Sequence, residues 1–396
     1  MAALLTAACA RDLGQPDLTL ATALDDAAHL PPAQALARLS TVEARALAPS
    51  QRLDLVTARA GLAIDAQLAA LPDTRGRGGG YRPLAGRIAP AHYALLLARP
   101  LGPVTPQAAR IRLARELARL HARAATQFAA IGLATGSIGE RYTRLWQDER
   151  SLYADPATAV ADMARALADA RARIPATIGP VPGWCTDVTV RSLSPAEIAA
   201  GRNGYRIAPT PSRQGAYIVD LKQLRRRPAW TLPGVVAHEL LPGHMIQLGL
   251  EGVVPPHPLR IEYAASFVEG WGVYAEALAA QDGAFADPQA MLGHLHWLIF
   301  RVARALVDLG IHLDGWSPDA ARARLVAWQG EPAYFAPFDT ELPRIAAEPA
   351  SRVAEAMAWL AIADAVGDRR GATRIAVHQR LLRHGRMRSD AVGNIS

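Results

Sequence analysis

Apolar side chains recur at three- and four-residue intervals along most of this chain, a spacing typical of amphipathic α-helices. The clearest case lies between Pro106 and Ile131, where an apolar stripe runs from Leu113 to Phe128 with arginines on the flanking faces. The pattern therefore predicts a mainly α protein. The other expected helices cover residues 17–71, 140–153, 156–174, 233–250, 259–280, 287–314, 318–329, 341–366 and 373–384.

A β pattern occurs only between residues 187 and 220. Residues 187–191 and 215–220 are rich in β-branched and aromatic side chains and are bounded by turn residues, which predicts two short strands. We therefore expect a small antiparallel β-sheet just before the next helix. The edge of such a sheet would suit backbone pairing with an extended peptide. The simpler interpretation is a hairpin that caps a helical domain.

Composition and charge favour a folded protein without a nucleic-acid partner. Hydrophobic residues make up 51% of the 396 positions, so a large core is expected rather than disorder. The formal net charge is +7, but nearly all of it is arginine, and Lys222 is the single lysine. These arginines are spread along helix faces and do not alternate with aromatic residues, as they would on a nucleic-acid stacking surface.

The N-terminus and the two cysteines bear on location. No stretch reaches the ~18 apolar residues that span a bilayer, so no transmembrane segment is expected. Cys9 and Cys185 form neither a metal motif nor a disulfide framework. Residues 1–9 are apolar and end in small residues before a cysteine, as in a lipoprotein signal, but they lack its basic n-region. The chain as written is expected in the cytoplasm, and an upstream start would make it an exported lipoprotein anchored at Cys9. The sequence indicates no oligomeric state.

The strongest candidate for chemistry is a short apolar segment that contains His238, Glu239 and His244. Burying such groups without partners costs roughly 2–7 kcal/mol each on transfer scales, and a divalent metal would satisfy them. The common zinc-protease arrangement has histidines four apart on one helical face, but these two are six apart and about 120° out of register. Because Pro242 breaks helical hydrogen bonding and Gly243 is permissive, we expect the helix to be distorted between the histidines.

Three glutamates at seven-residue spacing form a second group. Glu262, Glu269 and Glu276 would project from nearly one side of a helix. The helical neighbours of Glu269 and Glu276 are mostly small or apolar, which is not typical of a solvated face. A metal ligand and a carboxylate that orients another ligand would explain two of the three. A surface stripe is the alternative.

The two groups together resemble a known family. His-Glu-Leu-Leu-Pro-Gly-His at 238–244, followed by Glu-Gly-Trp-Gly-Val-Tyr-Ala-Glu at 269–276, is similar to the bacterial domain-of-unknown-function 885 family. Further similarity lies at 308–312 and 315–317, and weaker similarity lies at 205–220 and around His378, so that clear resemblance runs from about Tyr205 to the C-terminus. The resemblance implies a zincin-like, gluzincin-type metallopeptidase fold. We expect an N-terminal helical region over 1–174 and a zincin-like catalytic region over 175–396, in one compact unit.

The same resemblance implies roles for individual residues. The expected ligands of one catalytic zinc ion are His238, His244 and Glu269. Zinc chemistry agrees, because catalytic zinc takes three nitrogen or oxygen ligands plus water. Glu239, next to the first ligand, would be the general base and later deliver the proton to the leaving amine. Gln247 and Glu276 are candidates for orienting the ligands through hydrogen bonds.

Stabilisation of the oxyanion requires a further donor. Our first candidate is His312, which follows Asp308 by four residues on one helical face, so that the aspartate would orient it. Arg344 and Tyr217 are weaker candidates, for this role or for contact with substrate. The family usually has a tyrosine in the segment where this chain has Trp359, and its loss would slow or alter catalysis if that tyrosine assists the reaction.

The leading hypothesis is therefore a zinc metallopeptidase that cleaves amide bonds of short or extended peptides by metal-activated water, with Glu239 as base. One alternative is a metal-dependent hydrolase that acts on other amides or on esters. Another is a catalytically silent helical binding or envelope protein with a degenerate metal site. A peptide or other amide substrate is the expected partner in the first case.

Overall fold

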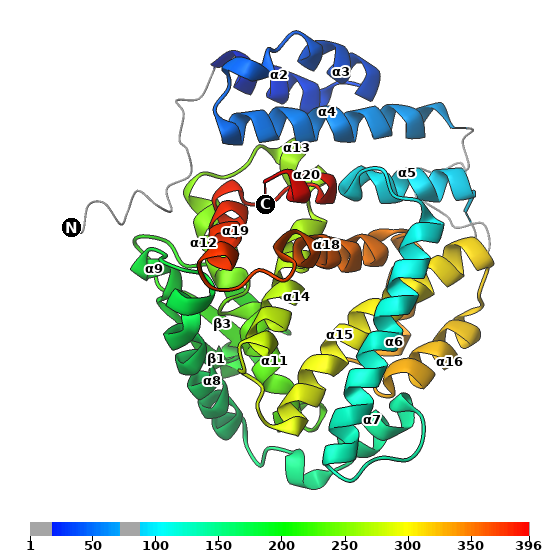
Figure 1. The fold of residues 1–396 in the computed structure, drawn as a ribbon, viewed down its shortest axis with the longest axis vertical. Coiled ribbons are helices and arrows are strands. Elements are labelled where there is room, and N and C mark those ends of the chain that lie inside the picture. The colour runs from blue at the N-terminus through cyan, green and yellow to red at the C-terminus, as the bar shows by residue number, and fades with distance from the viewer. Residues whose placement is uncertain (1–17, 72–87, 396) are drawn as a thin grey trace.

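The fold of the chain, drawn in Figure 1, comes from a computed structural model that describes residues 18–71 and 88–395. Cys9 lies outside the described residues, so its predicted role in anchoring has no structural counterpart here. The N-terminal half contains α2 (Leu18–His29), α3 (Pro32–Ser40), α4 (Pro49–Ala70), α5 (Pro90–Leu101), α6 (Pro106–Ala130), α7 (Ile138–Trp146), α8 (Pro156–Thr177), α9 (Gly183–Thr186), β1 (Val188–Ser192) and α10 (Pro195–Ala199).

The C-terminal half carries the remaining elements. They are β2 (Tyr205–Ile207), β3 (Gly215–Val219), α11 (Leu232–Glu239), α12 (His244–Val253), α13 (Pro258–Tyr263), α14 (Ser266–Gln281), α15 (Pro288–Leu309), the π-helix η5 (Gly310–Asp314), α16 (Pro318–Gln329), α17 (Phe338–Ala347), α18 (Ser351–Val366), α19 (Gly371–His384) and α20 (Ser389–Ile395); short 3₁₀ turns lie at 44–46, 149–151, 224–226 and 229–231.

The main body is built from helices that pack on α15. Helix α6 runs beside α15, and α18 and α14 also contact it (Figure 1). Helix α11 packs against both α14 and α8. One hydrophobic core extends from Tyr93 to Val392, so residues from 1–174 and from 175–396 contribute to the same core. The site described below lies where α11, α12 and α14 meet.

A separate small core holds the N-terminal helices together. Helices α2, α3 and α4 form a layer at the top of Figure 1, and α13 docks onto it through Leu259 and Tyr263. The contact is close at Gly61 of α4, where an added Cβ would lie 2.1 Å from the Tyr263 ring. The helical periodicity predicted over 17–71 is thus confirmed as three helices for the described part of that range.

The sheet was predicted only in part. Strands β1 and β3 match the two expected segments, but the sheet has a third strand, β2, and the order β1-β3-β2. Strands β1 and β3 pair in parallel, so the prediction that these two segments form an antiparallel sheet was wrong; the antiparallel partner of β3 is β2, which was not predicted. The chain crosses over through α10 between β1 and β2, which permits the parallel pairing. Strand β2 was missed because it is only three residues long and lies in a turn-rich stretch.

Several expected helices are broken where the chain turns. The segment expected over 341–366 is divided into α17 and α18, and the break falls at Pro349, where proline disfavours helical geometry in the preceding residue. The segments expected over 233–250 and 259–280 each form two helices, and the helix expected over 287–314 ends in the π-helix η5. The helix expected over 318–329 is confirmed as α16, whose first turn is capped by the Ser317 side chain, which accepts from the amide of Ala320.

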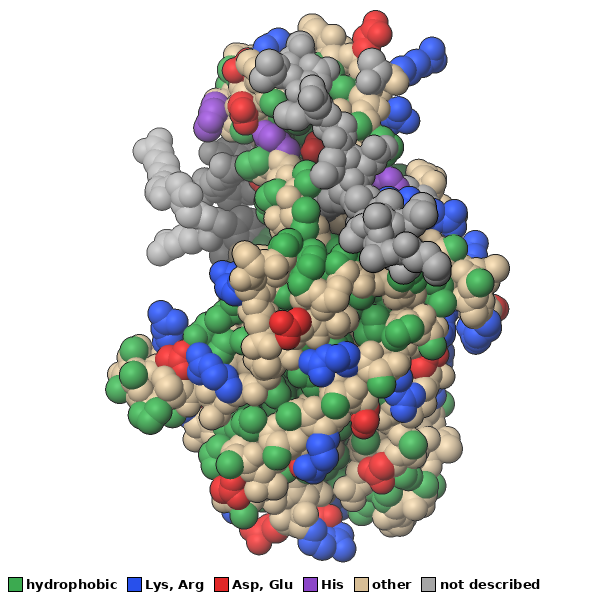
Figure 2. All heavy atoms as spheres, turned by 90° about the vertical axis from the view of Figure 1, so that its left-hand side faces the viewer, with side chains coloured by type: hydrophobic (Ala, Val, Ile, Leu, Met, Phe, Trp, Pro, Cys, Tyr) green, Lys and Arg blue, Asp and Glu red, His purple; other side chains and the backbone are tan. Residues whose placement is uncertain are grey.

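The described helices and the surface of the molecule bear on membrane and nucleic-acid partners. Among the described residues, none of the helices is sufficiently long and apolar to traverse a bilayer. Figure 2 shows one face of the molecule, on which side chains of both charges are scattered among hydrophobic ones without a large patch of a single sign.

Candidate metal centre

The helix containing the two histidines is interrupted between them. Helix α11 ends at Glu239, α12 begins at His244, and Leu240 has φ −112° and ψ −97°, outside helical geometry. The indole nitrogen of Trp271 donates to the carbonyls of Pro242 and Gly243 at 3.2 and 3.3 Å, which fixes this turn against α14. The predicted distortion is therefore confirmed, as a complete break rather than a bulge.

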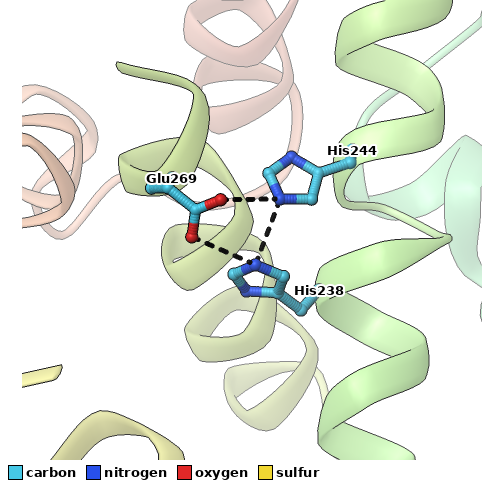
Figure 3. A group of neighbouring side chains, drawn as sticks. All are labelled: His238, His244 and Glu269. Atoms are coloured by element: carbon cyan, nitrogen blue, oxygen red, sulfur yellow. Dashed lines mark hydrogen bonds and ion pairs between the residues drawn. The ribbon is translucent and has the colours of Figure 1, made fainter. Parts of the chain in front are cut away.

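The break brings the two imidazole rings together with a carboxylate from α14. Figure 3 shows His238, His244 and Glu269 converging from three helices. The Nε2 atoms of the histidines are 3.1 Å apart. Glu269 places one oxygen 3.7 Å from His238 Nε2 and the other 3.6 Å from His244 Nε2. These three residues form a group that could hold a metal ion.

The spacing of the two imidazole nitrogens and the Glu269 carboxylate fits an ion with tetrahedral coordination. Zinc bonds of about 2.0–2.2 Å place two tetrahedral ligand atoms about 3.3–3.6 Å apart. The two histidine nitrogens are 3.1 Å apart, and each lies 3.6 or 3.7 Å from its own nearest Glu269 oxygen, distances close to this range. His238 and His244 are buried, while the Glu269 side chain is 31% exposed on the side of a cavity. The donor set fits a cation with one side open to the cavity, as in catalytic rather than structural zinc sites.

Glu276 supports the first histidine from behind. Its Oε1 lies 2.7 Å from His238 Nδ1, so the imidazole can donate to the carboxylate and present Nε2 toward the candidate ion. This is the carboxylate–histidine arrangement that fixes tautomer and ring orientation in metal sites. His294 of α15 lies on the far side of Glu276, with Nδ1 3.8 Å from Oε2. The predicted position of Glu276 as an orienting residue thus agrees with the geometry.

Protonation of the group follows from burial and from the charges next to each ring. Burial disfavours the imidazolium of His238, but the neighbouring carboxylates of Glu269 and Glu276 outweigh this effect and raise its pKa to about 9. Burial lowers the pKa of His244 to about 4, against the opposing effect of Glu269. Burial would raise the pKa of Glu269, yet Arg301 and the histidines hold it well below its usual value. Glu269 is therefore ionised, as a carboxylate that binds a metal must be.

Glu239 lies beside the ligands but faces the cavity. It shares a cavity of about 670 Å³ with His238 and Glu269, and its carboxylate accepts from Arg206 Nη1 at 2.7 Å. Arg206 belongs to the edge strand β2, so the sheet positions the expected base. A carboxylate in the cavity and adjacent to the ligands has the placement that a general base requires.

Two arginines of this site were missed in the sequence. Besides Arg206, Arg301 of α15 places Nη1 3.0 Å from Glu269 Oε2 and Nη2 3.5 Å from His238 Nε2. Both were counted among arginines on solvated helix faces, but the Arg301 side chain is only 9% exposed. The one local signal was the apolar surroundings of Arg301 within Leu-Ile-Phe-Arg-Val-Ala-Arg at 298–304.

Gln247 does not contact the ligand group in the described residues. It is buried on α12, one turn after the second histidine, and its Nε2 donates to Glu251 Oε2 at 3.0 Å. Glu251 in turn accepts from Arg386 near the C-terminus. Gln247 therefore takes part in tying α12 to the C-terminal region, and its predicted role in orienting a ligand gains no support from the geometry.

Asp308 and His312 also lie outside this cavity. The Asp308 carboxylate accepts from the Ala350 and Arg352 amides at 3.0 and 3.1 Å and from the Tyr93 hydroxyl at 2.9 Å, so it caps α18. Its Oδ1 is 3.9 Å from His312 Nε2, which instead lies 3.0 Å from the Ile345 carbonyl oxygen. His312 is fully buried and does not line the cavity, so the geometry does not favour the predicted oxyanion role.

The remaining candidates are divided between the cavity and the core. Tyr217 of β3 and Arg344 of α17 both line the cavity that contains Glu239, which agrees with contact to a substrate. Burial holds the pKa of Tyr217 well above its usual value, so its hydroxyl remains a donor. Trp359 is buried on α18 outside the cavity lining, and its backbone packs against Gly270.

Gly272 provides a test of this packing. An added Cβ at Gly272 would lie 2.7 Å from Cε1 and 2.8 Å from Nε2 of His238, closer than real contacts allow. We expect Gly272→Ala to displace the His238 ring and weaken zinc binding by roughly 10–100-fold, as for loss of a supporting residue. Titration against a zinc chelator measures the effect. Gly252→Ala on α12 is the control, because nothing lies within 4 Å of its added Cβ, and equal affinities would contradict the packing argument.

A comparison with family models places this chain among known sequences. A model described as "Bacterial protein of unknown function (DUF885)" matches residues 1–388. The chain belongs to the DUF885 family. The match extends the resemblance, which we expected from about Tyr205 onward, over nearly the whole DUF885 chain. A search of curated proteins found no match.

Solved structures share the fold of this DUF885 protein. A "putative lipoprotein" from Colwellia psychrerythraea is 21% identical with a TM-score of 0.66, and the alignment covers 94% of this chain and 67% of that one. A "putative lipoprotein of unknown function" from Shewanella oneidensis is 16% identical with a TM-score of 0.64, over 95% and 73% of the two chains. At these identities the likeness establishes the fold alone.

Proposed function

We propose that this protein is a metal-dependent hydrolase with a zincin-like, gluzincin-type site, and that its substrates are peptides. The observation that carries the proposal is the joint placement of the ligand set His238, His244 and Glu269 with a second carboxylate, Glu239, at one cavity. A zinc ion held there would supply Lewis-acid polarisation of water and of an amide carbonyl. Two imidazoles and one carboxylate are the ligand set of several zinc peptidases.

The proposed chemical roles belong to residues that face the cavity. Glu239 accepts the proton of the attacking water and later delivers it to the leaving amine, while Arg206 holds its carboxylate in place. Arg301 takes the role first assigned to His312, because its guanidinium lies within 3.5 Å of a ligand nitrogen. From there it can donate to the amide oxygen as negative charge develops. Glu276 fixes the orientation of the His238 ring through its hydrogen bond with Nδ1.

The sheet edge supports a peptide as substrate. Strand β2 is at the edge of the described sheet, and its residues Tyr205 and Arg206 line the cavity beside Glu239. An extended peptide could pair with such an edge through backbone hydrogen bonds and lie with an amide near the base. This favours a peptidase over a hydrolase of compact esters.

Zinc content and cleavage of a peptide library test the proposal together. We expect one zinc ion per chain, loss of cleavage after chelation, and recovery when zinc is restored. A zinc-loaded protein that cleaves no peptide but hydrolyses other amides or esters would overturn the peptidase assignment. A protein that does not bind zinc at all would overturn the metal centre itself.

A further inference from the structure

The cavity that contains the candidate metal centre has a second charged wall. Arg304 of α15, Arg344 of α17 and Arg352 of α18 line it together with His238 and Glu239. We call these three arginines the arginine cluster. The proposed chemistry uses none of them, so their presence requires a separate explanation.

The cluster combines buried and exposed guanidinium groups. The side chains of Arg304 and Arg352 are each 6% exposed, whereas that of Arg344 is 57% exposed. Buried arginines are rare unless their charge is compensated, because desolvation of an ion is costly. An exposed arginine in front of two buried ones is accessible to an anion that enters the cavity.

Two carboxylates serve the three cations, of which Glu341 is buried and Glu355 is 17% exposed. Glu341 lies 3.2 Å from Arg304 and 3.1 Å from Arg352. It is the nearest ion-pair partner of Arg344 as well, but at 3.7 Å, which is longer than a hydrogen bond. Glu355 contacts Arg304 and lies 3.0 Å from Arg352. Each carboxylate is therefore shared, so these two negative charges serve the three positive charges of the cluster as a whole.

The other nearby carboxylates do not remove this excess. Glu348 contacts Arg352 alone and is 51% exposed, so water screens its charge. Arg301, which borders the cluster, also lies 3.9 Å from Glu355 and so shares the charge of that carboxylate. The other partner of Arg301 is Glu269, which belongs to the candidate ligand set, and a bound cation would neutralise the charge of this carboxylate.

Arg304 shows the consequence of this imbalance most directly. Burial lowers its pKa, and neither Glu355 nor Glu341 fully compensates for the desolvation. Its Nε is buried and has no hydrogen-bond partner among the described residues. An unsatisfied donor on a buried cation is costly, and an anion from outside would relieve that cost.

We propose that the arginine cluster binds a carboxylate of the substrate, with Arg344 making the exposed contact. The inference rests on the proposed hydrolase function and names its substrate class: peptides with a free carboxylate close to the scissile bond. Guanidinium groups bind carboxylates through paired, charge-assisted hydrogen bonds, and a carboxylate is the anion that an unmodified peptide offers. The carboxylate is either the C-terminal group or an acidic side chain.

The size of the cavity limits the distance between the two groups. The arginine cluster and Glu239 share a cavity of about 670 Å³, within the ~300–1,000 Å³ range of small-ligand sites. A substrate whose carboxylate contacts Arg344 therefore presents an amide near its own carboxyl end to Glu239. If the carboxylate is C-terminal, the enzyme removes residues from the C-terminus of peptides.

Four matched peptides distinguish the two sources of the carboxylate. The peptide that the library identifies as cleaved is prepared with a free or an amidated C-terminus, and each form carries Asp or Asn at the penultimate position. For the zinc-loaded full chain we expect the favoured carboxylate to raise kcat/KM by roughly 10–100-fold, mainly through KM. A preference for the free terminus identifies the C-terminal group, and a preference for Asp over Asn identifies the side chain.

Arg344→Gln tests the cluster at its exposed member, which lies 3.7 Å from Glu341, beyond hydrogen-bond distance. We expect this variant to lose the preference for the carboxylate, so that its kcat/KM for the acidic peptide falls by roughly 10–100-fold to the value that the same variant shows for the neutral peptide. Arg115→Gln on α6 is the matched control, since Arg115 is likewise exposed on a helix but lies outside the cavity. A preference that persists in Arg344→Gln would overturn the proposal, whatever the absolute rates.

Binding separates failure of this inference from failure of the proposed function. Calorimetry on zinc-loaded Glu239→Gln compares acetyl-trialanine with its C-terminal amide and with acetyl-Ala-Asp-Ala amide. We expect one of the two acids to bind at least about 10-fold more tightly than the neutral amide. Equal binding overturns the carboxylate site even if peptides are cleaved. Selective binding without cleavage of any peptide keeps the carboxylate site and overturns the peptidase function.

Discussion

Glu239→Gln is expected to keep its zinc and to lose hydrolysis. The amide has nearly the size of the carboxylate and can still meet Arg206, so the end of α11 should keep its structure. It has no basicity, and general-base catalysis contributes roughly 10²–10⁴-fold to rate. We expect kcat to fall by that factor while zinc stoichiometry and KM stay near the wild-type values. Zinc analysis and steady-state kinetics on one protein preparation measure both quantities.

Glu149→Gln provides the control for this variant. Glu149 is 76% exposed and pairs with Arg225 on the surface, so its neutralisation should leave kinetics unchanged. Cleavage by Glu239→Gln at the wild-type rate would refute the assigned base, because no other described carboxylate lines the cavity directly beside a candidate ligand in sequence. Loss of both zinc and cleavage would instead identify Glu239 as a ligand.

His244→Ala is expected to have the second largest effect, on metal affinity. The ring is fully buried at the start of α12, and its Nε2 is one of the three converging atoms. Removing a ligand should cost more than the roughly 10–100-fold that loss of a supporting residue costs. We therefore expect Glu276→Gln to weaken zinc binding by about 10–100-fold and His244→Ala to weaken it further. Competition with a chelator of known affinity measures this order.

His121→Gln serves as the matched histidine control. His121 lies on α6 with Nε2 2.9 Å from the Trp328 carbonyl oxygen, outside the ligand group, so zinc affinity should not change. Circular dichroism on each variant excludes unfolding as the cause of lost zinc. Retention of zinc by His244→Ala together with its loss from His238→Ala would refute the three-residue ligand set.

Helical periodicity predicted where helices occur but not where they break. The stripe between Leu113 and Phe128 gave α6 almost to the residue, because its apolar face packs on one neighbour, α15, along its length. The breaks before α14 and α18 depend on how consecutive helices change direction around the core. The apolar residues have the same helical spacing on both sides of each break, so two consecutive helices were predicted as one. Strand β2 depends on pairing with β3, and a three-residue segment has too little pattern to predict.

The ligand group was predictable because its signal is local. His238, Glu239 and His244 stand among apolar residues, and Pro242 and Gly243 mark the break that brings the rings together. Spacing along one helix likewise placed Asp308 and His312 near each other, and their atoms are 3.9 Å apart. It could not tell which side of that helix faces the cavity.

The two missed arginines show that sequence spacing also cannot reveal which residues of distant elements reach the site. Arg206 and Arg301 reach the site from β2 and α15, elements that the packing of the whole body brings to the ligand group on α11, α12 and α14. In a chain with more than forty basic residues, composition gives no reason to single out either. Only the tertiary arrangement brings a guanidinium within 3.0 Å of Glu269.

The break between α11 and α12 has an energetic consequence for the protein. Because the three ligands come from α11, α12 and α14, an ion bound by them would cross-link three separately packed helices rather than decorate one. Binding free energy then becomes folding free energy, since the unfolded chain offers no such preformed group. Through this linkage the supply of metal would set how much of the protein is folded, and hence how long it survives proteolysis, before any substrate is present.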